Sequence, residues 1–361
     1  MPQQQNPRSS TWWFFLLFPK QGAGYGPRQM MFTLAASVGS QVNIAGISHQ
    51  GMDLRRPLAN GLDRFNTVAV GWIHDGVQLH EDVVHQLAPA TLSTEGYLTA
   101  WADAPGREPH GAEIRVAADD PLALEAHFRG ERGEARFRTW GDLDSRVTAP
   151  HEAINIHTPL GGTHFVAWRY VHFAGEFTSP AGTETLTGIG YFQRVCLNVP
   201  AFPWKWVWAL LPDGTLFSAY VPYAGLQALR RKHAFYRSGL EKATLPVLPG
   251  AFLYRPGWDD WLRVDRVAVR PDFNAGPYPH FAIRAANKAG DFIQFRAEPH
   301  AHARFFMDRQ VLRGRLRTHF DYNEYLFRMV GVSGRVAGQP FDEGSAGPGY
   351  GNLEYTWGLG F

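Results

Sequence analysis

The sequence predicts an all-β protein made of two antiparallel β-domains. Short apolar stretches recur along the chain, separated by Gly, Pro, Asp or Asn, and many of them are rich in Trp, Tyr, Phe, Val and Thr. Polarity alternates within these stretches, which is typical of strands with one buried face. The chain has 361 residues, which is enough for about two domains of ordinary size.

In chain order, the first expected strand is an aromatic run at residues 12–18, which ends before Pro19. This run is far shorter than the ~20 residues needed to cross a bilayer, and its bulky side chains favour a buried strand over a signal peptide. Turn dipeptides such as Asp213-Gly214 predict hairpins between later strands. Those strands are expected at residues 30–36, 67–72, 97–101, 135–140 and 165–173.

The clearest hairpin joins a Trp-x-Trp-x-Trp strand at residues 204–211 to a strand at residues 215–220. Because side chains alternate along a strand, Trp204, Trp206 and Trp208 are expected on one face. Successive hairpins of this kind build meanders, sandwiches or up-and-down barrels.

Three segments have a spacing that suits a helix, at residues 81–86, 123–129 and 225–236. The last is the best of them, because apolar side chains recur three to four apart and basic residues gather toward its end. It precedes a Pro-rich connection. We therefore expect a β-domain at residues 1–225 and a smaller β-domain at residues 226–361.

Charge and composition exclude several classes of function. Lys and Arg number 35 against 33 Asp and Glu, a formal charge of +2 without a basic stripe, so nucleic acid is not an expected partner. The single cysteine, Cys196, excludes an internal disulfide and is expected in buried apolar surroundings. No phosphate-binding glycine loop, dinucleotide fingerprint or nucleophile elbow occurs, so no cofactor is expected. We expect a cytoplasmic protein with at most transient membrane contact.

His300 and His302 form an H-x-H pair whose rings would lie on one face of a strand, as in some metal sites. A third ligand is not identifiable from the sequence. The expected role of these histidines is therefore hydrogen bonding or exposure, and no metal is expected.

Aromatic side chains are abundant, with 12 Trp, 13 Tyr and 25 Phe. They either fill the cores or line an apolar cavity, which a barrel can enclose when its own side chains leave space. Glu354 lies between Leu353 and Tyr355, in surroundings where burial would raise the pKa of its carboxyl. Three roles are open for Glu354: a buried structural acid, a residue of a ligand cavity, or an exposed side chain.

Three stretches, in this order, resemble one family. They are the aromatic strand at residues 12–15, the segment at residues 188–194 with the Trp-rich strand and Asp-Gly turn after it, and the terminal segment at residues 347–355. Together they resemble the carotenoid hydratases (hydroxyneurosporene synthases), the AttH-like proteins and the fungal Diels–Alderases, which share a double lipocalin-like fold. The resemblance covers most of the chain. It implies two lipocalin-like (calycin) β-barrels, a ligand cavity, and a polyprenoid or polyketide substrate.

The resemblance also implies a site. In the hydratases, an aspartate two residues after the tyrosine of the second segment is thought to protonate a terminal double bond, and the matching position here is Gln193. An amide cannot supply a proton, so either another acid such as Glu354 has this role or the protein does not hydrate alkenes. A Diels–Alderase needs no strong acid, because it folds a polyene and polarises a carbonyl, which Gln193, Tyr191 and Lys205 could do.

The candidate catalytic residues are therefore Glu354, Gln193 and Tyr191. The candidate substrate-binding residues are aromatic or cationic positions on the expected strands: Trp13, His164, Trp168, Arg194, Trp204, Lys205, Trp206 and Tyr355. Two functions follow from the sequence. One is a cofactor-independent enzyme that cyclises, hydrates or isomerises a long unsaturated substrate. The other is a non-catalytic carrier of a hydrophobic ligand.

Overall fold

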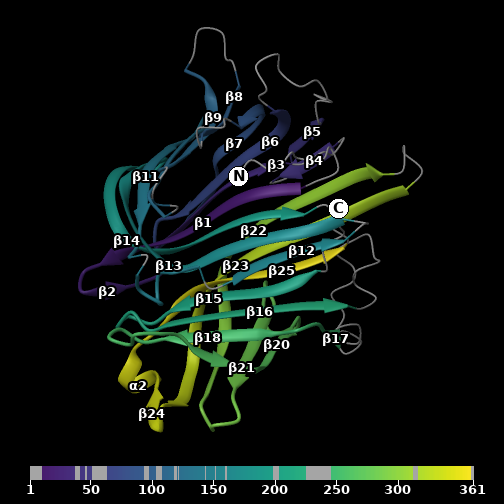
Figure 1. Cartoon of the computed structure of the whole chain (residues 1–361). Coiled ribbons are helices and arrows are strands. Elements are labelled where there is room, and N and C mark those ends of the chain that lie inside the picture. Colours follow the sequence, from purple (N-terminus) through teal and green to yellow (C-terminus); the bar gives the residue numbers. More distant parts are fainter. Residues whose placement is uncertain are drawn as a thin grey trace.

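The computed structural model describes most of the chain: residues 10–36, 41–44, 47–50, 63–92, 97–102, 108–117, 120, 122–142, 144–150, 152–158, 161–197, 203–224, 245–311 and 316–358. Almost all of this described part is β-structure, folded into two nearly closed antiparallel barrels, which confirms the predicted fold class. Figure 1 shows the N-terminal strands in the upper barrel and the C-terminal strands in the lower one.

The first barrel is formed by one antiparallel sheet. Its strands are β1 (Ser10–Gln21), β2 (Gly24–Tyr25), β3 (Gln29–Ala36), β6 (Asp63–His74), β7 (Leu79–Leu92), β8 (Tyr97–Ala102), β9 (His110–Val116), β10 (Leu124–Arg129), β11 (Glu134–Trp140), β12 (Glu152–Thr158), β13 (Gly161–Ser179) and β14 (Gly182–Leu197). Pairing of β11 with β13 brings the ends of the sheet together. Apolar side chains fill the interior, such as the stacked rings of Phe15 and Phe192, whose centroids are 4.7 Å apart. Cys196 near the end of β14 is a free thiol, half-buried rather than fully buried.

The second barrel contains the C-terminal strands and one short excursion from the N-terminal half. Its strands are β4 (Gln41–Ile44), β5 (Ile47–Gln50), β15 (Trp204–Leu210), β16 (Leu216–Ala224), β17 (Leu245–Pro246), β18 (Gly250–Tyr254), β19 (Leu262–Val264), β20 (Arg266–Asp272), β21 (His280–Ala286), β22 (Phe292–Val311), β23 (Leu316–Val336), β24 (Gln339–Asp342) and β25 (Tyr350–Gly358). The central strands pair in the order β16-β15-β25-β23-β22-β21-β20. A single helical turn, α2 (Glu343–Ala346), separates β24 from β25.

The Trp-rich hairpin is confirmed as β15 and β16, which pair antiparallel. In its turn Gly214 has a φ of 86°, a left-handed value that favours glycine. The Asp213 carboxylate accepts hydrogen bonds from the backbone N–H and the hydroxyl of Thr215, over 2.8 and 2.9 Å. The three tryptophans of β15 lie in one apolar cluster, so they share a face as the alternation predicts.

Two of the three expected helices are wrong. Residues 81–86 lie within β7, and the second segment forms β10. In β10 the buried side chains are Leu124, Ala126 and Phe128, which is the period of a strand. A short run of apolar residues fits either period, and pairing with β9 and β11 decides for the strand. The third segment, 225–236, lies outside the described residues. No helix in the described part of the chain is long and apolar enough to cross a membrane.

The chain passes from the first sheet to the second between β14 and β15, so the Trp-rich hairpin belongs to the second barrel. β4 also joins the second sheet, because it pairs with β22. The division at 1–225 and 226–361 concerns folding units, and its boundary falls at the edge of residues 225–244, which are not described. That division stays a prediction.

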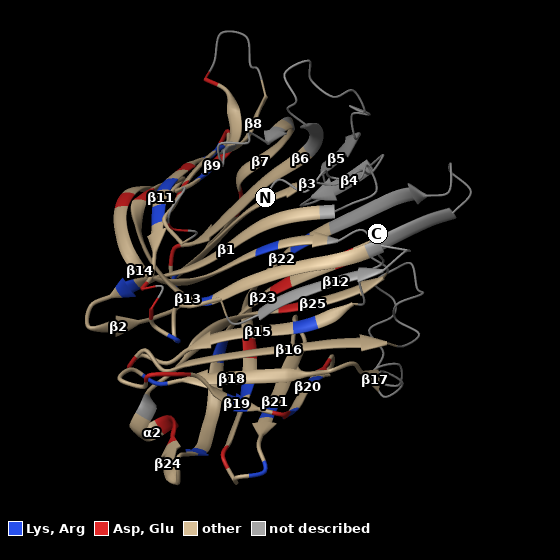
Figure 2. Ribbon diagram, in the orientation of Figure 1, with Lys and Arg blue, Asp and Glu red and all other residues tan. Residues whose placement is uncertain are grey.

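The outer faces of the two barrels pack together in a third apolar cluster. It contains Phe14 and Trp72 from the first barrel, and Trp206 and Trp208 from the second. The rings of Phe14 and Trp206 meet edge to face, with centroids 6.0 Å apart. Figure 2 shows that the strands around this junction are mostly uncharged, with red segments on β23 and β25. Because each buried aromatic side chain contributes about 2 kcal/mol, this junction holds the barrels firmly against each other.

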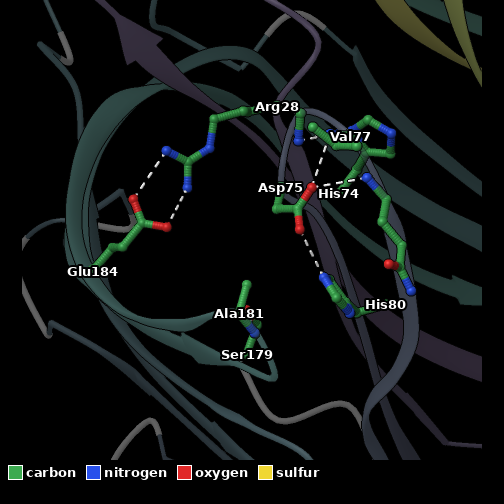
Figure 3. Close-up of polar contacts among 10 residues, drawn as sticks. Arg28, His74, Asp75, Val77, His80, Ser179, Ala181 and Glu184 are labelled. Carbon is green, nitrogen blue, oxygen red and sulfur yellow. Dashed lines mark hydrogen bonds and ion pairs between the residues drawn. The ribbon is translucent and has the colours of Figure 1, made fainter.

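Asp75 organises the turn between β6 and β7, and its loss should weaken the first barrel (Figure 3). Its carboxylate accepts from the backbone N–H groups of Val77 and Gln78, both over 2.8 Å. We expect Asp75→Ala to lower the free energy of unfolding by about 2 kcal/mol, since two backbone donors lose a charged acceptor. Asp82→Ala is the control, because Asp82 forms an exposed ion pair with Arg132 and its loss should cost less than about 1 kcal/mol. Urea unfolding measures both, and equal losses would contradict the assignment.

Candidate functional site

A cavity of about 100 Å³ lies at the junction between the two barrels. Strands of both sheets form its walls, with β1, β13 and β14 on one side and β15, β16, β18 and β25 on the other. Its lining residues are Trp12, Thr163, Phe165, Arg169, Tyr191, Gln193, Val195, Trp204, Trp206, Ser218, Tyr220, Phe252 and Glu354. The cavity therefore lies between the barrels rather than in the interior of one of them.

Glu354 reaches the cavity from the middle of β25. Its neighbours Leu353 and Tyr355 point into the second barrel, and strand alternation turns Glu354 to the opposite face. The residue is 2% exposed. The indole N–H of Trp204 donates to Oε2 and the hydroxyl of Tyr322 donates to Oε1, each over 2.5 Å. These two donors hold the carboxyl in one orientation, and its burial excludes the exposed role.

The surroundings of Glu354 favour a protonated carboxyl. Burial raises its pKa to about 7, although the hydrogen bonds from Tyr322 and Trp204 favour the charged form and oppose part of this rise. A group with such a pKa holds its proton in about half of the molecules at neutral pH. It can therefore act as a general acid or a general base.

Aromatic rings surround the cavity near this carboxyl. The ring of Tyr191 lies against that of Trp206, with centroids 4.6 Å apart, and Phe14 meets both rings at their edges. The Tyr191 hydroxyl donates to Oε1 of Gln193 over 2.8 Å. The Gln193 amide nitrogen can then donate to a ligand. Five of the residues selected from the sequence thus line one cavity, three from the second barrel and two from the first.

Arg169 brings a positive charge to the cavity wall, and the sequence analysis did not select it. The residue is 1% exposed, and its guanidinium carbon lies 3.4 Å from the ring centroid of Phe252 and 5.9 Å from that of Trp261. Such contacts stabilise a buried cation. Arg169 shares its strand face with Phe165, as strand alternation predicts. The sequence does not show that this face lies at the junction of two barrels.

Four of the predicted binding residues lie on the inner face of the first barrel instead. Trp13 and Trp168 belong to its core, and the guanidinium of Arg194 lies 5.3 Å from the centroid of the Trp13 ring. His164 shares the face of Trp168 by strand alternation. None of the four is among the lining residues of the cavity.

Lys205 and Tyr355 lie on the inner face of the second barrel. The Lys205 ammonium donates to the backbone oxygen of Val269 over 3.0 Å. It lies 5.4 and 5.3 Å from the ring centroids of Tyr223 and Tyr355. Burial lowers the pKa of Lys205 to about 7. These contacts hold the ammonium group inside the second barrel, and Lys205 is not among the lining residues of the cavity.

A second buried carboxyl, Glu324, lies beside the cavity and was missed as a site residue. It stands opposite Glu354 in the pairing of β23 with β25, and it is 0% exposed. The signal lies in the alternation of Phe320, Tyr322 and Leu326 with Glu324 on one strand face. The sequence shows that Glu324 lies on an apolar strand face. It does not show that this strand pairs with the strand that carries Glu354.

The H-x-H pair does not share a strand face, which corrects the expectation from the sequence. The ring of His300 lies 4.9 Å from that of His74 at the junction, whereas His302 stacks on Tyr325 inside the second barrel, 4.6 Å away. A β-bulge in β22 beside His300 breaks the alternation. Among the described residues, no group of three or more His, Cys, Asp or Glu side chains is arranged to hold a metal ion.

Comparison with known proteins gives two structural similarities. The chain is similar to a protein of Nitrosomonas europaea described as a "putative AttH", with 12% identity, a TM-score of 0.48, and coverage of 97% of this chain and 92% of the other. It is also similar to kievitone hydratase from Nectria haematococca, with 12% identity, a TM-score of 0.46, and coverage of 98% and 90%. No protein-family model and no curated protein matches the sequence.

Proposed function

We propose that this protein is an enzyme that protonates a carbon–carbon double bond of a long apolar substrate, with Glu354 as the acid. One observation carries the proposal: a buried carboxyl with a pKa of about 7 lies in the wall of an aromatic-lined cavity. Protonation of an isolated alkene forms a carbocation, so it requires an acid that still holds its proton and aromatic faces that stabilise the positive charge. The cavity supplies both.

The size of the cavity favours the end of the substrate as its reacting part. An apolar cavity of ~150 Å³ holds a benzene molecule. A cavity of about 100 Å³ therefore suits the branched end of an isoprenoid chain, but not the whole chain. The rest of the substrate would lie outside the enclosed space. The bond that reaches Glu354 is then a terminal double bond of a long apolar molecule.

The residues around the acid define the course of the reaction. The proton of Glu354 adds to the terminal double bond, whose π electrons form the new C–H bond and leave a carbocation beside the carboxylate. Hydrogen bonds from Tyr322 and Trp204 stabilise the carboxylate, and the faces of Trp206 and Tyr191 stabilise the cation. Addition of water gives an alcohol and returns a proton to Glu354. Attack by a second double bond of the substrate instead closes a ring and leaves a new carbocation, which loses a proton to the Glu354 carboxylate and forms a new double bond.

The hydrogen bond between Tyr191 and Gln193 supports a second function for the same cavity. It fixes the Gln193 side chain, whose amide nitrogen could polarise a carbonyl of a folded polyene. Cyclisation would then proceed without proton transfer, by holding the reacting carbons together. This is the Diels–Alderase-like chemistry that the family resemblance implies, and it does not require Glu354.

Solvent labelling distinguishes these functions. The purified protein is incubated with polyprenoids and polyenes that end in a branched double bond, in heavy water and in oxygen-18 water. Hydration places deuterium on carbon and oxygen-18 in the alcohol, and proton-initiated cyclisation or isomerisation places deuterium alone. A pericyclic product carries neither label. A tightly bound ligand without any product would identify a carrier and overturn the proposed enzyme.

Trp206→Ala should weaken ligand binding without removing the fold. The Trp206 ring supplies a large part of the aromatic wall beside Tyr191, and loss of such an anchor typically costs about 2 kcal/mol, or roughly 30-fold in Kd. Fluorescence or calorimetric titration with a polyene measures the affinity, and circular dichroism measures the fold. Trp140→Ala is the control, because Trp140 is 38% exposed and is not among the cavity residues. Unchanged affinity in folded Trp206→Ala would assign this ring to packing alone.

A further inference from the structure

Glu324 and Glu354 form a pair of buried acids on neighbouring strands. They stand directly opposite each other in the register of β23 and β25, so their Cβ atoms are about 4.5–5.5 Å apart. Each accepts one indole N–H: Trp72 of the first barrel donates to Glu324 over 2.6 Å, and Trp204 of the second donates to Glu354 over 2.5 Å. The two barrels thus each contribute one indole donor to the pair.

Tyr322 lies on the same face of the sheet as the two carboxyls. It precedes Glu324 by one step of the alternation on β23, so both side chains face the junction. Its hydroxyl donates to Oε1 of Glu354, and it also lies close enough to Glu324 to influence the pKa of that acid. Its hydrogen bond holds the Glu354 carboxyl in place on the same face of the sheet as Glu324.

Neither acid forms an ion pair in the described part of the chain, and the Arg169 guanidinium on the cavity wall lies over the ring of Phe252. The nearby buried Asp321, in contrast, is paired with Arg304. The titratable groups that act on Glu324 are Glu354 and Tyr322, and the one that acts on Glu354 is Tyr322. A buried carboxylate without a cation is costly, and two of them side by side are costlier still. The pair therefore keeps at least one proton at neutral pH.

We propose that Glu324 and Glu354 share protons as a buried carboxyl pair, in which Glu324 is a positioning residue that keeps Glu354 protonated for catalysis. The catalytic part rests on the proposed function, whereas proton sharing stands on the geometry alone. When Glu354 transfers its proton to the substrate, a neutral Glu324 leaves one negative charge in the site rather than two. The proton released when water adds to the carbocation then returns to the pair.

Infrared spectroscopy of the full-length protein tests proton sharing without any substrate. At pH 8 exposed Asp and Glu side chains are ionised, so the C=O absorption of a protonated carboxyl reports buried acids. We expect the wild-type protein to keep this band at pH 8, and Glu324→Gln and Glu354→Gln each to weaken it. Asp321→Asn is the matched control, because Asp321 is equally buried but ion-paired, and it should leave the band unchanged. Absence of the band from the wild-type protein would overturn the pair, whatever the variants do.

The pH profile of turnover tests the positioning role. A coupled pair loses its last proton at a higher pH than a single acid, so Glu324→Gln should move the alkaline limit of activity down by about one pH unit. Glu324→Asp restores the acid and should move the limit back. A limit that Glu324→Gln leaves unchanged would reduce Glu324 to a structural role and overturn this part of the proposal. Normal infrared behaviour in a protein that converts no alkene would support the pair and overturn the proposed function instead.

Discussion

We expect Glu354→Gln to lose turnover while it keeps the fold and the affinity for ligand. Glutamine keeps the shape of the side chain. Its single oxygen can accept from the indole of Trp204 and its amide nitrogen can donate to the hydroxyl oxygen of Tyr322, but it has no proton to give to an alkene. Because a positioned general acid contributes between about a hundredfold and ten-thousandfold, we expect turnover to fall by roughly a thousandfold. Product formation under saturating substrate measures this loss, and a binding titration measures the affinity.

Gln193→Ala is the matched variant for this experiment. Gln193 lines the same cavity but cannot supply a proton, so its loss should affect proton-initiated chemistry far less than the loss of Glu354. If Glu354→Gln turned over normally and Gln193→Ala did not, the acid mechanism would be wrong. The pericyclic function would then be the better explanation of the cavity.

We expect the carboxyl pair to make the protein less stable as the pH rises through neutrality. Burial, together with the charge of Glu354, raises the pKa of Glu324 to about 8, and burial raises that of Glu354 to about 7, from an ordinary value of 4.5. Between pH 5 and pH 7 the folded protein therefore holds protons that the unfolded chain has released. Stability that is present below pH 4.5 is lost in this range. At 1.36 kcal/mol for each pKa unit, the loss is roughly 5 kcal/mol for the two groups.

Other groups also change stability with pH, so the comparison needs a reference protein. Burial lowers the pKa of His74, which favours the folded state as the pH rises toward 6.5, and the lowered pKa of Lys205 acts in the same direction above pH 7. The double variant Glu324→Gln/Glu354→Gln keeps both of these groups. We expect the wild-type protein to lose unfolding free energy relative to the double variant from pH 5 to pH 7, as measured by urea unfolding. If the unfolding free energies of the two proteins changed in parallel with pH, neither carboxyl would have a raised pKa.

The fold was open to prediction because strand signals are local. The Asp-Gly turn and the alternating tryptophans of β15 define a hairpin by themselves, and the structure confirms it. Residues 81–86 were misread as a helix because a run of six residues contains too few turns to separate the two periods. Pairing with β6 makes this segment a strand, and such pairing is not visible in a single sequence.

The sequence predicts the site only in part, because the site lies between the outer faces of two barrels. Alternation placed Glu354 opposite to Leu353 and Tyr355, and the structure agrees. Alternation cannot say whether the outer face of a barrel meets solvent or a second barrel. Lys205 was therefore grouped with Trp206, although the two side chains point into different spaces. The register that brings Glu324 to Glu354 depends on the pairing of distant strands, which no local pattern encodes.

The shared wall of the cavity links ligand binding to the docking of the two barrels. Tyr191 and Gln193 belong to one sheet, while Trp206 and Glu354 belong to the other, so a ligand finds its complete set of contacts only when the sheets are packed together. A ligand that binds only when the sheets are packed together stabilises this packed arrangement. The stabilisation grows with the logarithm of the ratio of ligand concentration to Kd. Substrate thus increases the population of the packed arrangement. That arrangement also keeps Glu354 buried. Under the proposed function, the molecule to be protonated would therefore help to maintain the dry surroundings on which the acid depends.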